Sequence, residues 1–359
     1  MRLDTACSTG EAPVLHWKTA ITRGTLNRVA INGIGVVAPS AIADVDRFDT
    51  SGLTAHKAAL VRDFNPRDYI APLKMRRMNA LSRYAVSAAR KAIDDYGNEL
   101  PRETGVAVGT AFGPVQTSVD YMREYVEKGA ALAPPQLFAE SVANAPGSHI
   151  AIEWGLRGFN VTITQRESSA LAAAMYASSQ IVKGSVRAAI IGGVEEVTEM
   201  VFSVLDRLGA LDDSMQNGMV IGEGSAMLIA EPSETARYGF LSGFGIARDV
   251  TATVSNWGED PNAVVTAMRA AIDDAELSPT DIDAIYASAN GVPRCDDVEA
   301  RAIRLLFGNP VVVKTKQIFG EYAAAGALQL VEALRSPDRN VLVNSISAGG
   351  GIVCAVVTR

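Results

Sequence analysis

The turn around Glu167 is the segment whose residue types and spacing point most directly to chemistry. The stretch TQRESSALAAAMYASSQIVKGSVRAAIIGGVEE, residues 164–196, predicts the end of a buried strand, a tight turn, a helix and a second strand that closes on Gly192 and Gly193. A strand-to-helix turn of this kind presents its central side chain to a site, and here that side chain is a carboxyl. Burial would raise the pKa of Glu167, whereas the helix N-terminus and neighbouring Arg166 would lower it. The turn therefore predicts either an acid–base group or a carboxylate that anchors the chain.

Composition narrows the other chemistry that the chain could perform. The three cysteines, Cys7, Cys295 and Cys354, show no CxxC or Cys/His spacing, which argues against both a disulfide framework and a zinc site. The net charge of −7 comes without basic clusters, so no nucleic-acid partner is predicted. No apolar run approaches the ~20 residues of a membrane helix, and the N-terminus lacks the order of a signal peptide. We expect a cytoplasmic protein with no metal and no membrane contact.

Two successive series of strands and helices organise the chain. Residues 1–26 show little periodicity and predict a flexible extension, followed by an N-terminal half over 27–233 and a C-terminal half over 234–359. The expected elements are a strand at 28–40, a helix at 77–97, a strand at 104–114, the unit at 161–196, two short strands within 218–232, a strand at 238–248, a helix at 261–276, a strand at 282–288, a helix at 297–307, a strand at 310–314, a helix at 323–335 and strands at 340–346 and 351–357. Each half ends in a glycine-rich strand pair, which predicts a duplicated α/β fold.

Seven short motifs occur in a fixed order along the chain. They are RVAINGIGVVAPS, GTAFGP, SSALAAAMYASSQIVKGSVRAAIIGGVEE, GEGSAMLIAEP, DIDAIYASANGVPRCDDVEA, KQIFGEYAAAG and NSISAGGG. In this order and spacing they resemble the β-ketoacyl synthases of the thiolase superfamily, over about residues 28–359. The resemblance implies an α/β, five-layered αβαβα fold with two pseudo-duplicated halves, and a dimer that associates across a strand edge.

The resemblance also implies a set of reacting groups, and this chain departs from that set. The family places a cysteine nucleophile at the strand-to-helix turn and two histidines that hold a malonyl thioester during decarboxylation. The nucleophile position falls on Glu167, and the two histidine positions fall on Ser288 in ASANGV and Glu321 in KQIFGE. The lysine of the last motif is matched by Lys316. We therefore expect no condensing triad at this site.

The remaining histidines and an N-terminal cysteine do not restore these groups. His16 lies in the expected extension and His56 in a polar stretch, while His149 is predicted to pack or to form a hydrogen bond on a helix. The phrase DTACSTG around Cys7 reproduces the family's nucleophile sequence, but it precedes the first strand and no apolar helix follows it. We interpret it as a coincidence.

Two loops lack residues that the family pattern contains. The segment DDSMQNGMVI, residues 212–221, is shorter than the family's active-site segment with its aromatic and aspartates. In the closing loop, Ala348 stands before Gly349 and Gly350 where the family has a gating phenylalanine. Both changes remove parts of a condensing pocket.

Within this family, subunits without the nucleophile resemble the chain-length factors of type II polyketide and polyene synthases. The resemblance implies a non-condensing subunit that pairs with an active ketosynthase, more readily as a heterodimer than as a homodimer. Its helices and the 105–145 region would set the depth of the acyl tunnel. It would need no cofactor of its own, because an acyl carrier protein presents the substrate on phosphopantetheine. Arg76 and Arg77 are the residues expected at the carrier's point of entry.

Two other functions stay open at this stage. One is a stand-alone enzyme on carrier-protein- or CoA-bound acyl thioesters, in which Glu167, Glu321 and Lys316 perform acid–base chemistry such as dehydration, cyclisation or hydrolysis. The other is a structural homodimer that scaffolds carrier proteins. The simplest hypothesis for the residues themselves is structural: Glu167 anchors the turn or pairs with Arg166 or a dimer partner, and Glu321 pairs with Lys316.

Overall fold

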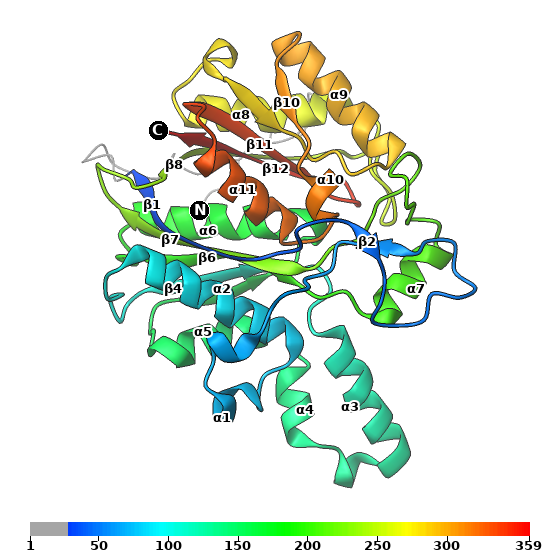
Figure 1. Ribbon diagram of the computed structural model, residues 1–359. Helices are drawn as coiled ribbons and strands as arrows, with labels where there is room; N and C mark the ends of the chain where they lie inside the picture. Colours follow the sequence, from blue (N-terminus) through cyan, green and yellow to red (C-terminus); the bar gives the residue numbers. More distant parts are fainter. Residues whose placement is uncertain (1–27) are drawn as a thin grey trace, which may run out of the picture.

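The computed structural model describes residues 28–359, and ten strands of this region form two groups of five (Figure 1). The first group comprises β1 (Val29–Val37), β4 (Gly105–Gly109), β5 (Asn160–Ile163), β6 (Ala189–Glu195) and β7 (Gly224–Pro232). The second group comprises β8 (Gly239–Arg248), β9 (Ala284–Tyr286), β10 (Val311–Val313), β11 (Asn340–Ile346) and β12 (Gly351–Thr358). The expected extension, with Cys7 and His16, lies outside the described residues.

The two groups repeat one pairing pattern. In the first, β4 pairs in parallel with β5 and β6, β6 is antiparallel to β7, and β7 is antiparallel to β1. In the second, β9 pairs in parallel with β10 and β11, β11 is antiparallel to β12, and β12 is antiparallel to β8. A short pairing of β1 with β8 joins them into the order β10-β9-β11-β12-β8-β1-β7-β6-β4-β5. The predicted duplication is confirmed.

Helices cover both outer faces and fill the space between the two strand groups. The main ones are α2 (Ala80–Tyr96) and α5 (Ala145–Trp154) outside the first group, α6 (Ser169–Val182) and α11 (Ala325–Arg335) between the groups, and α8 (Pro261–Asp274) and α9 (Pro293–Phe307) outside the second. The largest apolar cluster joins α6 and α11 to strands of both groups. The arrangement is therefore the five-layered αβαβα architecture that the sequence predicts.

Local chemistry explains where two helices depart from their expected ends. The helix α2 begins at Ala80 rather than at 77, because Asn79 caps it by accepting a hydrogen bond from the Ser82 amide at 2.6 Å. It ends, as expected, before Gly97, which adopts a left-handed conformation. The helix α9 begins at Pro293, four residues earlier than expected, since proline fits a first turn that needs no N–H.

The two short strands expected within 218–232 are one strand. Only β7 is regular, and residues 219–222 make isolated bridges to separate segments instead. One of these bridges connects Ile221 to Glu321 in the other half. The apolar run at 218–222 therefore crosses between the halves rather than extending the sheet.

The remaining elements are short, apart from the helices of a projecting arm. They are β2 (Ala43–Asp44), β3 (Lys57–Ala58), η1 (Pro66–Asp68), α1 (Pro72–Met75), α3 (Val115–Lys128), η2 (Ala130–Leu132), α4 (Pro135–Glu140), η3 (Arg166–Ser168), α7 (Glu199–Arg207), η4 (Pro279–Asp281) and α10 (Lys316–Phe319). No helix within residues 28–359 has both the length and the apolar character that crossing a membrane would require.

The helical arm, residues 112–142, extends away from the body of the molecule (Figure 1). It contains α3, η2 and α4, and its two longer helices are held together by the rings of Tyr121 and Phe138, 5.5 Å apart. In α3 only Thr117 is buried. Its exposed large apolar residues are Phe112, Met122, Tyr125, Val126, Leu132, Phe138 and Val142. So much apolar surface on one projection is typical of a region that contacts another molecule.

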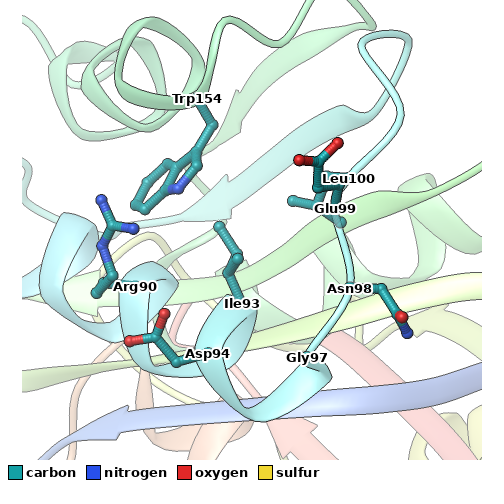
Figure 2. A pocket seen from close by; sticks show the side chains of 8 residues that line it. All are labelled: Arg90, Ile93, Asp94, Gly97, Asn98, Glu99, Leu100 and Trp154. Carbon is teal, nitrogen blue, oxygen red and sulfur yellow. The ribbon is translucent and has the colours of Figure 1, made fainter.

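An open cavity of about 620 Å³ lies on the outer side of α2 (Figure 2). Its wall contains Arg90, whose guanidinium lies 4.7 Å from the ring of Trp154, together with Asp94 and Glu99. Because α2 and α5 cover the outer face of the first strand group, this cavity is separated by the sheet from the inner helical layer.

We expect Gly192→Ala to lower the free energy of unfolding by about 3 kcal/mol. A Cβ at this position of β6 would lie 1.9 Å from the carbonyl oxygen of Ala226 on β7, so the strands would have to separate. The control is Gly97→Ala, where the space is open and only the left-handed conformation, with a φ of +75°, opposes the change, at a cost of about 1 kcal/mol. Urea denaturation measures both, and equal losses would contradict the close strand packing.

Candidate functional site

Glu167 lies where the two halves of the chain meet. It belongs to η3, between β5 and α6, so the strand, turn, helix and strand expected at 161–196 are confirmed. The preceding residue, Arg166, has a φ of +49°, a left-handed conformation that is uncommon for a residue with a side chain. Such backbone strain is concentrated at functional turns, because the surrounding structure must hold it in place.

Serine side chains tie this turn to the end of β11 in the other half. The Ser168 amide donates to Ser347 Oγ at 3.0 Å, and Ser168 Oγ donates to the Ser345 carbonyl at 3.0 Å. In return, Ser345 Oγ donates to the Glu167 carbonyl at 3.1 Å. Ser347 Oγ also lies 3.0 Å from the Gln165 carbonyl oxygen. These reciprocal contacts fix the backbone on both sides of the Glu167 side chain.

The predicted closing loop, Ala348 to Gly350, covers the same carboxyl. The Ala348 amide donates to Glu167 Oε2 at 3.1 Å. Gly349 and Gly350 have φ values of +92° and +84°, which lets the chain turn back sharply. The Gly349 amide donates to the Asn256 carbonyl at 2.9 Å, so a second loop holds this one in place. No side chain larger than a methyl group projects from the loop toward Glu167.

Lys316 and Glu321 form a buried ion pair in the same region. Lys316 Nζ lies 2.7 Å from Glu321 Oε2, and both side chains are at most 2% exposed. The Asn290 side-chain amide donates to the same carboxylate oxygen at 2.8 Å. Lys316 Nζ also donates to Ser288 Oγ at 3.3 Å, and Ser288 in turn accepts from the Ile346 amide at 2.9 Å. The structure thus brings Ser288, Lys316 and Glu321 together, with the ion pair that the sequence predicts.

These neighbours determine how Glu167 and Lys316 ionise. Burial, followed by the charge of Glu321, raises the pKa of Glu167 to about 7, and the charge of Lys316 and the Ala348 amide offset only part of this rise. Burial alone would lower the pKa of Lys316, but the charge of Glu321 and its hydrogen bond produce a net rise. At neutral pH, Lys316 is therefore charged and Glu167 is close to half-protonated. A carboxyl in this state can both give and accept a proton.

The negative charge of Glu321 is only partly balanced by hydrogen bonds and by Lys316. Oε1 is buried and has no hydrogen-bond partner within residues 28–359. The lysine contacts the other oxygen, so the negative charge on Oε1 is free to act on Glu167. The charge of Lys316 therefore acts on both carboxyl groups, and protonation of Glu167 relieves its repulsion by Glu321.

A third acid, Glu299, extends the network and was missed by the sequence reasoning. Its Oε1 accepts from the Ser288 amide at 2.8 Å and from the Asn344 side chain at 3.0 Å. It is fully buried, and that burial raises its pKa. Helical spacing could have identified it, because Glu299 lies beside Val298 and Ala302 on the buried face of α9.

The shortened segment at 212–221 forms a tight loop against this network. Asp212 accepts hydrogen bonds from three of the following backbone amides, which lower its pKa to about 2. The loop's backbone packs so closely on Gly291 that a Cβ there would lie 2.5 Å from the Gly218 carbonyl oxygen. The loop at 212–221 therefore lies directly beside Asn290, the residue whose side chain contacts Glu321.

Arg76 and Arg77 are not part of this centre. Both are exposed at the C-terminal end of α1, outside the first strand group, and neither forms an ion pair within residues 28–359. Their predicted role at a carrier's point of entry stays a prediction.

Both histidines of the described region have partners elsewhere. His149 Nε2 lies 2.8 Å from Glu140 Oε1, in agreement with its predicted role in hydrogen bonding, and His56 Nδ1 lies 3.1 Å from Thr50 Oγ1. Between residues 28 and 359, no group of three or more His, Cys, Asp or Glu side chains could hold a metal ion.

Comparisons with known proteins agree on one family. The model for "Beta-ketoacyl synthase, N-terminal domain" matches residues 36–236, and the model for "Beta-ketoacyl synthase, C-terminal domain" matches residues 238–348. The 3-oxoacyl-(acyl-carrier-protein) synthase 2 of Vibrio harveyi is 26% identical over 350 residues, which are 85% of this chain and 84% of that protein.

Solved structures agree in fold. The ishigamide ketosynthase/chain length factor superposes with a TM-score of 0.82 at 24% identity, covering 92% of this chain and 99% of that one. The ketosynthase ApeO in complex with its chain length factor ApeC, from Xenorhabdus doucetiae, gives a TM-score of 0.80 at 18% identity, covering 92% and 98%. These likenesses confirm the fold expected from the motifs.

We expect Glu167→Gln to flatten the pH dependence of stability between pH 5 and pH 8. The folded state raises the pKa of Glu167 from 4.5 to about 7, so its favourable contribution is full below pH 4.5 and is lost as the pH rises through 7. The loss amounts to roughly 3 kcal/mol of unfolding free energy. Glu167→Gln should not show it, because a glutamine side chain does not titrate. Urea denaturation at both pH values measures it, with the exposed Glu127→Gln as control. Parallel curves for wild type and Glu167→Gln would exclude the raised pKa.

Lys316→Met is expected to destabilise the protein by about 3–5 kcal/mol, because it leaves Glu321 buried without its counter-ion. Adding Glu321→Gln to the same chain removes that charge and should recover part of the loss. A double-mutant cycle by chemical denaturation gives the coupling energy. If the double variant is no more stable than Lys316→Met, the two residues do not act as a pair.

Proposed function

The chain belongs to the β-ketoacyl synthase family, and from this premise we propose that it is a non-condensing subunit of chain-length-factor type. In this role it pairs with an active ketosynthase and shapes the tunnel that receives the growing acyl chain, which an acyl carrier protein delivers. The observation that carries the proposal is the Glu167 carboxyl at the strand-to-helix turn. A carboxyl at this turn does not form the thioester on which condensation depends.

The two cysteines of the described region do not supply a substitute thiol. Cys295 lies in α9 and Cys354 in β12, and both are buried. Burial raises the pKa of each thiol well above its ordinary value, so the reactive thiolate is disfavoured. Neither lies at the turn, which supports a subunit without condensing activity.

Two surfaces suit a partner subunit. The strand β5 ends the sheet order, so one of its edges has no strand beside it within residues 28–359, and it leads directly to Glu167. The helical arm follows β4, the neighbour of β5, and exposes its apolar residues. A ketosynthase covering both would lie next to the Glu167 turn, where arm residues could define the tunnel. The similar structures that contain a ketosynthase with its chain length factor support this type of partner.

One observation favours a second candidate function. Glu167, Glu321, Lys316 and Ser288 converge on one centre, and the pKa of Glu167 is raised to about 7 by burial and by Glu321. This arrangement suits an acid–base enzyme acting on an acyl thioester by dehydration, cyclisation or hydrolysis. In such an enzyme, Glu167 would be indispensable, whereas in the proposed subunit it would not be.

Co-expression with a ketosynthase encoded beside this chain distinguishes the two functions. We expect a 1:1 complex that makes product and keeps its yield in Glu167→Gln, because the partner performs the chemistry. Val126→Glu in the arm should weaken the complex about tenfold or more, since it places a charge in an apolar contact. Leu305→Glu, at a similarly exposed apolar position of α9, is the control and should leave the complex intact.

The opposite outcome is equally specific. A homodimer that turns over acyl thioesters without a ketosynthase and loses this activity in Glu167→Gln would contradict the proposal and assign acid–base catalysis to the carboxyl. Size-exclusion chromatography with mass determination and a thioester assay decide between the two.

A further inference from the structure

A groove lined by arginines lies at the edge of the molecule where the described chain begins and ends. It has a volume of about 360 Å³, and the residues that give it its character are Arg237, Tyr238, Phe240, Arg335 and Arg359. Figure 1 shows the C-terminus and the start of β1 at this edge. We call these five residues the arginine groove. No aspartate or glutamate side chain lines it.

The arginine groove is separate from the Glu167 centre. The helix α11 begins four residues after Glu321 and ends at Arg335, in the wall of the groove. Its 11 residues span roughly 16 Å at 1.5 Å per residue. A ligand in the groove would therefore bind at the opposite end of α11 from the buried ion pair.

Neutral groups hold two of the guanidinium groups at this edge. Arg359 Nη2 donates to the carbonyl oxygen of Leu334, the last residue of α11 but one, at 2.5 Å. The Arg28 guanidinium lies 3.7 Å from the centre of the Phe240 ring, directly behind the groove. These contacts position positive charge without neutralising it.

The other two arginines are only partly balanced by acids. Arg237 contacts the Asp95 carboxylate at 3.1 Å, but this carboxylate also accepts from the Tyr238 hydroxyl at 2.8 Å. Arg335 is exposed and forms no ion pair within residues 28–359, not even with Glu332 one turn earlier in α11. Arg335 therefore keeps its donors available at the rim.

Positive charge predominates among the residues that line the groove. Three arginines line it, Arg237, Arg335 and Arg359, and no acid does. Asp95 pairs with Arg237, and the charges of Glu332 and Asp338 act, together with that of Arg359, on Tyr286 nearby. Three arginines so far apart in the sequence show no basic cluster until the fold brings them together.

We propose that the arginine groove binds a phosphate monoester. Each guanidinium presents five N–H donors in a planar fork that matches two phosphate oxygens, and three such groups line the groove. Arg335 provides the free fork, and Arg237 and Arg359 add donors that are already held in position. This site is independent of the function proposed above, because none of its residues contacts the Glu167 centre.

Isothermal titration calorimetry of the intact chain tests the site with two probes, inorganic phosphate and adenosine 5′-monophosphate. We expect saturable binding of both with one site per chain. Equal affinities would show that the groove recognises phosphate alone, and tighter binding of the nucleotide would assign the Tyr238 side of the groove to its base. Absence of saturable binding by either probe would overturn the proposal.

Variants of Arg335 separate specific recognition from general attraction. Arg335→Ala should weaken phosphate binding roughly tenfold, the loss of one charge-assisted contact. Arg335→Lys keeps the charge but loses the fork, so it should also bind more weakly than wild type. The control Arg67→Ala removes an equal charge from an exposed position in η1 and should change nothing. Equal effects of Arg335→Ala and Arg67→Ala, or full binding by Arg335→Lys, would overturn the proposal.

Discussion

The buried ion pair between Lys316 and Glu321 is the interaction on which the centre of this protein depends. Both charges are almost completely removed from water, and each would be costly without the other. The pair satisfies only one oxygen of Glu321, so the remaining negative charge acts on Glu167. The ionisation of Glu167 is therefore set first by its burial and then by a charge arrangement in the other half of the chain.

The duplicated fold explains why such an arrangement can exist. Each half contributes the same strand order, and the helices between them bring the end of β5 next to the end of β11. Serine hydroxyls then connect the two chain segments across this boundary. The chain belongs to the β-ketoacyl synthase family, and at this boundary it places acids, a lysine and a serine. The tunnel-shaping role that we propose depends on the scaffold and requires no reaction at this boundary.

Much of this could be predicted from local sequence. Periodicity and glycine positions give the Glu167 turn, the end of α2 at Gly97 and the duplicated order of elements, because these depend on neighbouring residues. The structural hypothesis that Glu321 pairs with Lys316 is also confirmed. Long-range features are harder to predict from the sequence. The contacts of Asn290 and Glu299, and the arginine groove, depend on segments that only the folded chain brings together. The single strand at 224–232 was missed because an apolar run does not reveal what it pairs with.

In the proposed subunit, Glu167 carries no covalent acyl intermediate. Intact-protein mass spectrometry of the complex with a ketosynthase, after brief incubation with an acyl carrier protein bearing a labelled acyl group, tests it directly. We predict that the mass of the acyl group appears on the ketosynthase and that the mass of this chain stays unchanged. An acyl adduct on this chain that disappears in Glu167→Gln would contradict it.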